Sequence, residues 1–310
     1  MLTVFLEVLL PVALVALVGY TLRWRMPLDQ RTLNRVVIYG MNPALIFTSL
    51  TAADLSGPNA LHMLTLAVGV ALVMGAVATS VAVPLGVRGG NLSAVLLVSM
   101  FMNSGNYGLP AARFAFGEEG FTQALFYFVA QSVLAQTLGV AVAAAGNARA
   151  KRGLAREVLI RTLRMPQVYA TIAALLVRST GFDPAAQTGP LLGGFRALSL
   201  LGEASLPMML IVLGVQLAGG VTREEPRLLV LTALLRLVVS PLVAYGLGLA
   251  LGMDQLSLAV GVMLAGMPAA VNSTIIALEF DSRPSLVVAT VIVTSLLSLL
   301  TLSAILAVFQ

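Results

Sequence analysis

The sequence predicts an all-α polytopic membrane protein with ten transmembrane helices, arranged as two inverted five-helix repeats in which spans 4 and 9 are broken. Three observations lead to this prediction. Hydrophobic residues make up 59% of the 310 residues and charged residues only 10%, whereas globular proteins carry about 25% charged residues. The apolar residues fall into stretches near the roughly 20 residues that cross a bilayer. Prolines recur at similar places in both halves of the chain.

The ten spans are separated by short segments rich in Asp, Gly, Asn and Pro, which favour turns. In chain order the expected spans cover residues 3–22, 33–52, 60–86, 92–114, 121–145, 165–179, 190–218, 226–251, 255–280 and 284–309. The first repeat is expected at residues 1–146 and the second at residues 165–310, with a basic loop at 147–164 between them.

Three pairs of prolines indicate that the two halves are related. They lie at offsets of 155, 164 and 158 residues and are Pro11 with Pro166, Pro43 with Pro207, and Pro110 with Pro268. A repeat at a fixed period indicates duplicated units. Because each unit has an odd number of spans, the second must run through the membrane in the opposite direction. Inverted repeats of this kind are typical of secondary transporters.

Basic residues predict the orientation, because cytoplasmic loops of membrane proteins carry an excess of Lys and Arg. With the N-terminus outside, 14 of the 18 basic residues fall on the inner side, six of them in the central loop. Arg113, Arg178 and Arg196 fall outside, and Arg236 lies within a span. We therefore expect a multi-pass protein of the cell inner membrane, with both termini outside and the central loop in the cytoplasm.

The fourth and ninth spans contain residues that cannot continue an unbroken helix. The fourth reads Asn103-Ser104-Gly105-Asn106-Tyr107-Gly108-Leu109-Pro110, and the ninth reads Ala265-Gly266-Met267-Pro268-Ala269-Ala270-Val271-Asn272-Ser273. Proline removes a backbone donor and clashes with the preceding turn, and the freed backbone groups need a protein-lined or wet cavity. We therefore expect two discontinuous helices with a substrate site between them.

The breaks also predict the charge of the substrate. The half-helices expected to start after Gly108 and after Pro268 would present free amides and the positive end of a helix dipole. Such ends bind carboxylates without a fixed cation, and neither break contains Lys, Arg or His. An anion held by backbone amides and asparagine side chains is the expected substrate.

These segments resemble the auxin efflux carrier family, which includes the plant PIN carriers and bacterial malate and malonate permeases. The run from Asn103 to Pro110, with Phe116-Gly117 after it, is the most specific part, and residues 265–273 carry the resemblance in the second half. Supporting matches are Asn34-Arg35-Val36 with Pro43, and Leu206-Pro207 with Leu213-Gly214. The resemblance covers the whole chain, and the short central loop is similar to that of the bacterial branch.

The resemblance implies a carrier in which spans 4 and 9 cross at their unwound midpoints, where the substrate binds. Spans 1, 2, 6 and 7 would form a scaffold and the interface of a homodimer, and spans 3–5 and 8–10 would move as an elevator. The site residues that it implies are Asn106, Pro110, Pro268 and Asn272, followed by Asn103, Gly105, Tyr107 and Ser273. No cofactor and no metal are expected.

Four further polar residues are candidates on their own chemistry. Arg236 lies inside the eighth span, where a charge is costly; it could contact substrate, act in gating, or pair structurally, with Glu203 as a candidate partner. Glu203 could instead couple transport to protons or lie at the interface. Asn42 could satisfy the kink at Pro43 or line the pocket, and Gln131 could line the pocket or bond between helices.

Other classes of function lack the residues they need. The chain has one His, no Cys and no Gly-x-x-x-x-Gly-Lys motif, so neither an intramembrane protease nor a nucleotide-driven pump is expected, and the protein is not expected to be an enzyme. So few charges form no face for nucleic acid; the expected partners are the lipid bilayer and a small organic anion. A sodium-coupled organic anion symporter of the bile acid type and an anion channel remain as alternatives, and both an auxin-like acid and a dicarboxylate are compatible.

Overall fold

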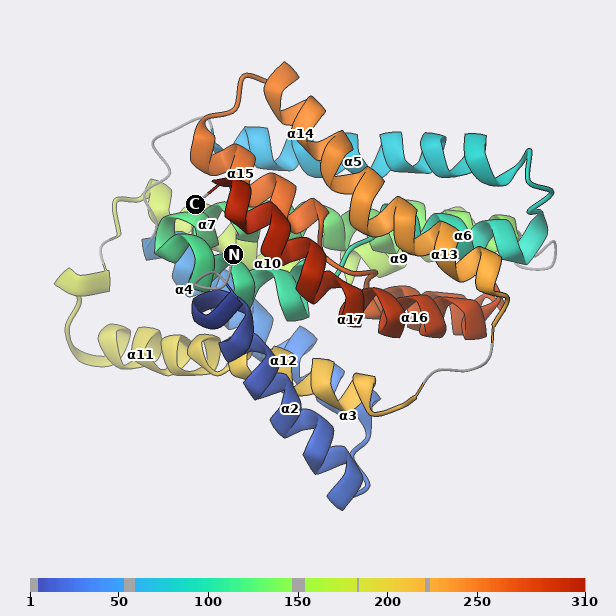
Figure 1. Cartoon of the computed structure of the whole chain (residues 1–310). Helices are drawn as coiled ribbons and strands as arrows, with labels where there is room; N and C mark the ends of the chain where they lie inside the picture. Colours follow the sequence, from blue (N-terminus) through green and yellow to red (C-terminus); the bar gives the residue numbers. More distant parts are fainter. Residues whose placement is uncertain (1–4, 53–58, 147–153, 183, 221–223, 310) are drawn as a thin grey trace.

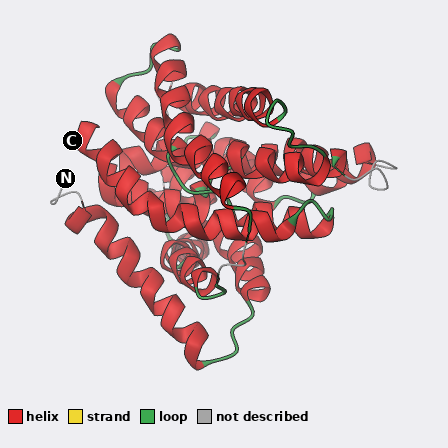
Figure 2. Ribbon diagram, turned by 45° about the vertical axis from the view of Figure 1, so that its right-hand side comes forward, coloured by secondary structure: helices red, strands yellow, loops and turns green. Residues whose placement is uncertain are grey.

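The computed structural model describes residues 5–52, 59–146, 154–182, 184–220 and 224–309, and every regular element within these ranges is a helix, as Figure 1 and Figure 2 show. The elements are η1 (Phe5–Leu9), α2 (Leu10–Arg25), α3 (Gln30–Val36), η2 (Val37–Met41), α4 (Asn42–Ala52), α5 (Asn59–Ala82), α6 (Gly89–Met100), η3 (Ser104–Gly108), α7 (Leu109–Leu134), η4 (Ala135–Gly139), α8 (Val140–Ala145), α9 (Leu154–Leu163), α10 (Pro166–Ser179), η6 (Pro184–Ala186), α11 (Gly189–Glu203), α12 (Ser205–Leu217), α13 (Pro226–Leu234), η7 (Leu235–Val239), α14 (Ser240–Ala250), α15 (Gln255–Ala265), α16 (Val271–Glu279) and α17 (Pro284–Phe309). The expected all-α class is confirmed for these residues.

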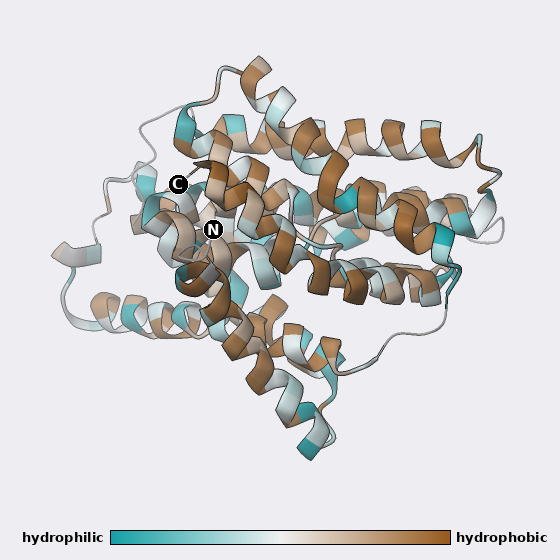
Figure 3. Ribbon diagram, in the orientation of Figure 1, coloured by the Kyte–Doolittle hydropathy of each residue, from teal (hydrophilic) through white to brown (hydrophobic). Residues whose placement is uncertain are grey.

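Several of these helices have the length and composition of membrane spans. In the described ranges six segments qualify, namely Leu6–Arg25, Asn59–Ala82, Ser104–Ala145, Gly189–Leu217, Pro226–Ala250 and Pro284–Phe309. Their outer faces expose large apolar side chains, for example Leu72 at 54% and Leu242 at 64%. Figure 3 shows hydrophobic residues along α5, α13 and α14. Soluble proteins rarely expose surface of this kind, so these faces fit a lipid environment.

The fourth and ninth predicted spans are broken, as expected. The first break separates α6 from η3, and the second separates α15 from α16. The helix after the first break begins at Ser104 and not after Gly108, because η3 runs directly into α7 and Pro110 lies inside that helix. The interrupting residue is Asn103, whose φ of −77° and ψ of 58° belong to an inverse γ-turn, with the Ser104 amide 2.8 Å from the Met102 carbonyl.

Two spans that contain mid-helix prolines stay continuous by widening one turn. The π-helical turns η2 and η7 end two residues before Pro43 and Pro241. In each, the amide just before the proline reaches back five residues: Asn42 donates to Val37 and Ser240 donates to Leu235. The extra residue relieves the clash between a proline ring and the preceding turn. A π-bulge of this type often marks a functional position.

The helices pack in two groups. In the first, which we call the paired group (α2, α4, α10, α11 and α12), α2 lies along α12 and α4 lies against α10 and α11. In the second, the crossing group (α5, α6, α7 and α13–α17), α5 packs on α6, α7, α14 and α15, and α17 packs on α6, α13 and α16. Figure 1 places α2 and α12 below and α5 and α14 above. The two broken helices therefore both belong to the crossing group.

The contact between α2 and α12 is made backbone to backbone. A Cβ atom at Gly19 would lie 2.0 Å from the Ile211 carbonyl oxygen, and one at Gly214 would lie 1.7 Å from the Ala16 carbonyl oxygen. Only glycine fits at either position, as is common where membrane helices approach closely. The paired group is thus joined by a crossing that no side chain can enter.

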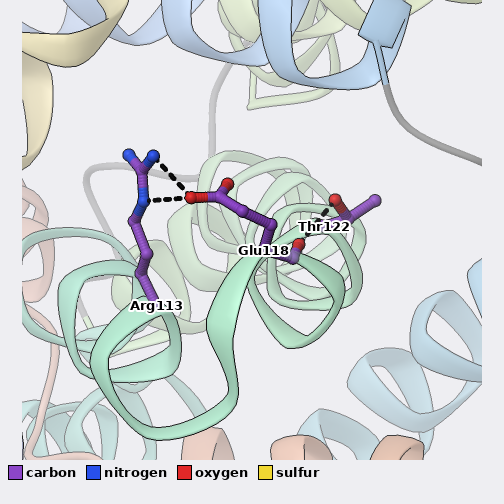
Figure 4. A network of polar contacts seen from close by, with 3 residues as sticks. All are labelled: Arg113, Glu118 and Thr122. Atoms are coloured by element: carbon purple, nitrogen blue, oxygen red, sulfur yellow. Dashed lines mark hydrogen bonds and ion pairs between the residues drawn. The ribbon is translucent and has the colours of Figure 1, made fainter.

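A tight turn ends the half-helix that follows the first break. Gly117 has a φ of 64° inside α7, a left-handed conformation that glycine adopts without cost. Figure 4 shows Arg113 reaching across this turn to Glu118, with Arg113 Nε donating to Glu118 Oε1 at 2.7 Å, while the Thr122 hydroxyl donates to the Glu118 carbonyl at 2.9 Å. These contacts connect the half-helix to the rest of α7.

The central segment holds a helix where the sequence predicts a loop. Helix α9 occupies Leu154–Leu163 and packs on η4 and α8, while residues 147–153 lie outside the described residues. The helix is too short and too charged to cross a bilayer. Leu154 and Val158 pack against the core, whereas Leu159 and Leu163 are exposed, as are Arg156 and Arg164.

Candidate functional site

The two breaks meet and hydrogen-bond to each other. The amide of Asn103 donates to the Pro268 carbonyl at 2.7 Å, and the amide of Ala270 donates to the Phe101 carbonyl at 3.0 Å. Between them, Met102 and Ala269 form an isolated antiparallel β-bridge. The unwound segments of two helices thus hydrogen-bond to each other, because backbone polar groups in a membrane need partners within the protein. We call this junction of four half-helix ends the crossover.

A cavity of about 50 Å³ lies at the crossover. It is bounded on one side by the starts of η3 and α16 and on the other by residues of α4, α7, η2 and α10. Six residues expected from the sequence line it, namely Asn42, Asn103, Gly105, Asn106, Gln131 and Asn272. The side chains that the sequence singled out from four separate spans therefore converge on one small space.

Polar atoms in this cavity lack protein partners. The Asn103 side-chain nitrogen is buried without a hydrogen-bond partner among the described residues, and the buried Gln131 amide, which lies beside the Tyr127 hydroxyl, has no partner of ordinary hydrogen-bond geometry. Leaving such an atom unpaired costs about 1–3 kcal/mol. Asn42 differs, since its side-chain oxygen accepts a hydrogen bond of 2.7 Å from the Ser205 hydroxyl on α12. Asn103 and Gln131 are therefore available to bind a ligand, whereas Asn42 connects α4 to α12.

Gly105 lets the backbone at the start of η3 lie close to the ring of Phe128. A Cβ atom at Gly105 would lie 2.8 Å from an edge carbon of Phe128, which lines the same cavity. The amide groups at the start of η3 can therefore face the cavity directly. Both helix starts at the crossover present the positive end of a helix dipole.

Some of the expected site residues lie elsewhere. Tyr107 lines a separate apolar cavity of about 150 Å³, with Val12, Leu213 and Leu299 among its neighbours. Pro110 is the second residue of α7, and Ser273 is buried but lines no described cavity of the crossover. These three residues therefore do not line the crossover cavity. The π-helical turn η3 changes the face on which Tyr107 and Pro110 lie, whereas Ser273 lies on α16 beyond the second break.

Pro268 acts through its backbone. It does not line the crossover cavity, and its carbonyl is the acceptor for Asn103. The expected equivalence of Pro110 and Pro268 is not seen, because Pro110 lies within a helix whereas Pro268 lies in the extended segment and pairs with Asn103. The matching positions of the two breaks are Phe101 and Pro268, at an offset of 167 residues.

Arg236 is fully buried on η7 and binds both broken helices. One guanidinium nitrogen donates to the Ser99 carbonyl at 2.7 Å, and another donates to the Ala265 carbonyl and to the Ser240 hydroxyl. Glu203 is exposed on α11, and within the described ranges no ion pair joins it to Arg236. The candidate partnership of Arg236 with Glu203 is therefore wrong, since backbone carbonyls take that place.

The structure adds two residues to the site. Asn34 and Gln167 are each 5% exposed and line the crossover cavity. Asn34 lies on α3 and Gln167 in the first turn of α10. Each is an amide side chain near the basic end of an expected span, and this was the one feature that could have marked it as a site candidate. The sequence does not show that those helix ends lie beside the breaks.

A wider cavity of about 910 Å³ adjoins the crossover cavity. The two share Asn34, Ile38, Ser132, Gln167 and Asn272. We call the wider one the vestibule. Five arginines line it, namely Arg31, Arg35, Arg156, Arg161 and Arg164.

The charge of the vestibule is strongly positive. Glu279 is the one acidic residue among the described residues that line it, and it forms an ion pair with Arg161. All five arginines are among the basic residues predicted to lie on the cytoplasmic side. A wall of one charge raises the local concentration of ions of the opposite sign, so the vestibule attracts anions toward the crossover.

Comparison with known proteins identifies the family of this chain. The family described as "Membrane transport protein" matches residues 4–306. The chain belongs to that family. The resemblance to auxin efflux carriers seen in the sequence is confirmed, and the protein is a membrane transport protein along its whole length.

Individual relatives agree with this assignment. An uncharacterized transporter of Methanothermobacter thermautotrophicus is 31% identical over 303 residues, which cover 96% of this chain and 95% of the relative. An uncharacterized transporter of Methanocaldococcus jannaschii is 25% identical over 305 residues, 96% of each chain. A Rhizobium meliloti protein named "Putative malonate transporter" is 26% identical over 285 residues, 88% of this chain and 85% of the relative.

Proposed function

We propose that this membrane transport protein is a secondary carrier that moves a small organic anion across the cytoplasmic membrane by elevator-type alternating access. The observation that carries the proposal is the crossover cavity, where two helix starts meet unpaired amide groups of Asn103 and Gln131. A carboxylate accepts hydrogen bonds from such donors and is favoured by the positive ends of both dipoles.

The lining of the cavity supports an anion over a cation. The described residues around it carry no formal charge, and its polar groups come mainly from Asn, Gln and Ser. A carboxylate held by neutral donors also leaves more easily than one held by a fixed charge at contact, which turnover requires. A buried neutral ester would leave some donors unpaired, at about 1–3 kcal/mol for each.

The packing of the paired group supports an inverted repeat of ten spans. The expected first span packs on the seventh, and the second packs on the sixth. If span 1 is exchanged with span 6 and span 2 with span 7, the contact of span 1 with span 7 becomes the contact of span 6 with span 2. Two inverted copies require this symmetry. In the proposed mechanism the crossing group, with the site, moves past the paired group, which forms the scaffold and the interface of a homodimer.

The vestibule supports an inward-facing arrangement. Its arginines come from the side expected to face the cytoplasm, and it shares five lining residues with the crossover cavity. In this state an anion enters from the cytoplasm, passes the arginines and reaches the helix starts. On that orientation both termini lie outside.

A short dicarboxylate is the substrate class that fits best. A cavity of about 50 Å³ holds one carboxylate group, since a water molecule occupies about 30 Å³ in the liquid. A second carboxylate on a short chain would then extend toward the vestibule arginines. The name of the Rhizobium meliloti relative points to malonate, which has this form.

Binding of malonate, its monomethyl ester and its dimethyl ester to the purified protein tests the proposal. We expect malonate to bind at least 10-fold more tightly than the dimethyl ester, the scale of one charge-assisted hydrogen bond. Uptake of malonate into proteoliposomes should saturate with concentration. Equal binding of acid and diester would overturn the anion site, and single-channel conductance would overturn the carrier.

A further inference from the structure

Arg236 donates hydrogen bonds to the backbone carbonyls that the two breaks leave without amide donors. In an unbroken helix the Ser99 carbonyl would accept from the amide four residues later, at Asn103, and the Ala265 carbonyl from Ala269. Both amides are diverted: Asn103 donates to Pro268 at 2.7 Å, and Ala269 donates to the Thr294 hydroxyl at 3.1 Å. Arg236 donates to both of the carbonyls left behind.

The carbonyls that Arg236 binds are the negative ends of two half-helices. Ser99 lies one residue before the end of α6, and Ala265 is the last residue of α15. The Ser240 hydroxyl also donates to the Ala265 carbonyl, at 2.9 Å. No carboxylate contacts Arg236 among the described residues. Its charge is therefore balanced by helix ends and not by an acid.

The charges at the crossover do not cancel. Each helix start carries about +0.5 of an elementary charge and each helix end about −0.5, so two starts and two ends sum to roughly zero. Arg236 adds one full positive charge in a buried place where screening by water is weak. The crossover as a whole then carries about one positive charge, which a single bound carboxylate would neutralise.

We propose that Arg236 is the fixed positive charge of the substrate site, acting on the bound carboxylate without touching it. It does not line the crossover cavity, and it lies on the opposite side of the crossover, at the helix ends. It is a positioning residue in that it holds α6 and α15 together, and its charge sets the preference for an anion over a neutral ligand. This inference rests on the proposed function.

The test compares acid and ester binding in three variants. Arg236→Met removes the charge, Arg236→Lys keeps it, and Ser240→Ala removes a hydroxyl partner while leaving the charge in place. For each, the dissociation constants of malonate and its dimethyl ester and the melting temperature are measured. We expect the acid-over-ester preference to fall about 10-fold in Arg236→Met, the scale for a unit charge acting over roughly 10 Å at an effective dielectric of about 20.

The controls separate charge from architecture. At pH 6, where the lysine keeps its proton, Arg236→Lys and Ser240→Ala should keep the preference within about 3-fold of the original protein, although both should melt at lower temperature. A merely structural role would weaken acid and ester alike in Arg236→Met and leave their ratio unchanged, and that result would overturn the inference. If the original protein itself prefers neither ligand, the proposed function fails instead.

A second measurement applies if Arg236→Met does not fold. Buried lysines lose their proton at much lower pH than arginines, which stay charged. The acid-over-ester preference of Arg236→Lys should therefore fall as pH rises from 6 to about 10, while that of the original protein stays level. Tyr127 is the ionisable neighbour of Arg236 and is present in both proteins. A level profile in Arg236→Lys would overturn the inference.

Discussion

The paired group and the crossing group join their helices by different kinds of contact. In the paired group, α2 and α12 meet at Gly19 and Gly214, where backbone touches backbone and polar side chains play no part. In the crossing group, helices are interrupted, and Arg236 and the β-bridge bind the exposed backbone. The first arrangement favours a rigid support, and the second leaves polar groups available for a ligand. The rigid contact thus lies in the paired group and the broken helices lie in the crossing group, while α4 and α10 of the paired group also contribute Asn42 and Gln167 to the cavity.

The largest effect should come from closing the space between α2 and α12. Gly214→Ala would put a Cβ atom 1.7 Å from the Ala16 carbonyl oxygen, where only a shift of the helix backbone could make room. We expect a loss of 3 kcal/mol or more, at the upper end for overpacking, seen as a loss of folded protein by size-exclusion chromatography.

The matched control is Gly246→Ala on α14, where an added Cβ atom meets nothing within 4 Å. Alanine favours a helix over glycine by about 1 kcal/mol, so this variant should be as stable as the original protein or more so. Normal folding of Gly214→Ala would contradict the backbone contact that distinguishes the paired group.

The next effect concerns affinity and not stability. Asn106→Ala and Asn272→Ala each remove an amide at a helix start that lines the crossover cavity. A hydrogen bond to a charged group contributes about 1.5–3 kcal/mol, so affinity for malonate should fall about 10-fold to 100-fold, with little change in melting temperature. Isothermal titration of purified protein measures both constants.

Ser273→Ala is the control for these two variants. Ser273 is 1% exposed and adjoins Asn272, but it does not line the cavity. Its removal should leave affinity unchanged. A loss equal to that of Asn272→Ala would place the binding surface on another face of α16.

A smaller effect should follow from removing the cap of α15. Asp254 accepts hydrogen bonds from the Ser257 amide at 2.9 Å and the Ser257 hydroxyl at 2.6 Å. Asp254→Ala should cost about 1 kcal/mol of stability, as is typical for a helix N-cap. Affinity for malonate should stay the same, because the cap lies at the far end of α15 from the crossover. Thermal denaturation of the two proteins measures the difference.

The pH dependence of that difference has a definite sign. Burial raises the pKa of Asp254, but hydrogen bonds from Ser257 and nearby amides lower it further, so the net pKa is below its ordinary value. A lowered pKa in the folded protein gives stability that is present above the unfolded pKa of about 3.9 and is lost as pH falls through the folded value. The two proteins should therefore differ at pH 7 and converge in strong acid.

The smallest effect is a labelling difference without functional change. The chain has no cysteine, so Ala155→Cys on α9 and Ser179→Cys at the end of α10, both exposed, report on the two sides of the membrane in the expected orientation. In intact cells an impermeant thiol reagent should label Ser179→Cys and spare Ala155→Cys. Labelling of Ala155→Cys would reverse the expected orientation and the inward-facing assignment of the vestibule.

The sequence predicted those features that depend on local residue chemistry. Apolar stretches predicted the helices, and the glycine, asparagine and proline residues predicted both breaks. Asn103, Asn106 and Asn272 were expected at the site and line the cavity. Each of these inferences needs only the residues within one turn of helix.

The sequence could not predict contacts made by backbone atoms far along the chain. Arg236 binds a carbonyl 137 residues away and another 29 residues away. Because every residue type has the same backbone carbonyl, the sequence does not indicate which carbonyls accept these bonds. Tyr107 was misplaced for a related reason. The π-helical turn at Ser104–Gly108 alters which face each side chain takes, and Tyr107 then lies in the apolar cavity.

The β-bridge between Met102 and Ala269 has a consequence for how the protein is made. Met102 is synthesised 167 residues before its partner Ala269, an interval of roughly 10–30 s at 5–20 residues per second. Until then the first break sits in the membrane without its backbone partners. The growing chain must therefore be sheltered at this point by water in the insertion machinery or by a chaperone, and the first five spans made alone should be degraded and not accumulate.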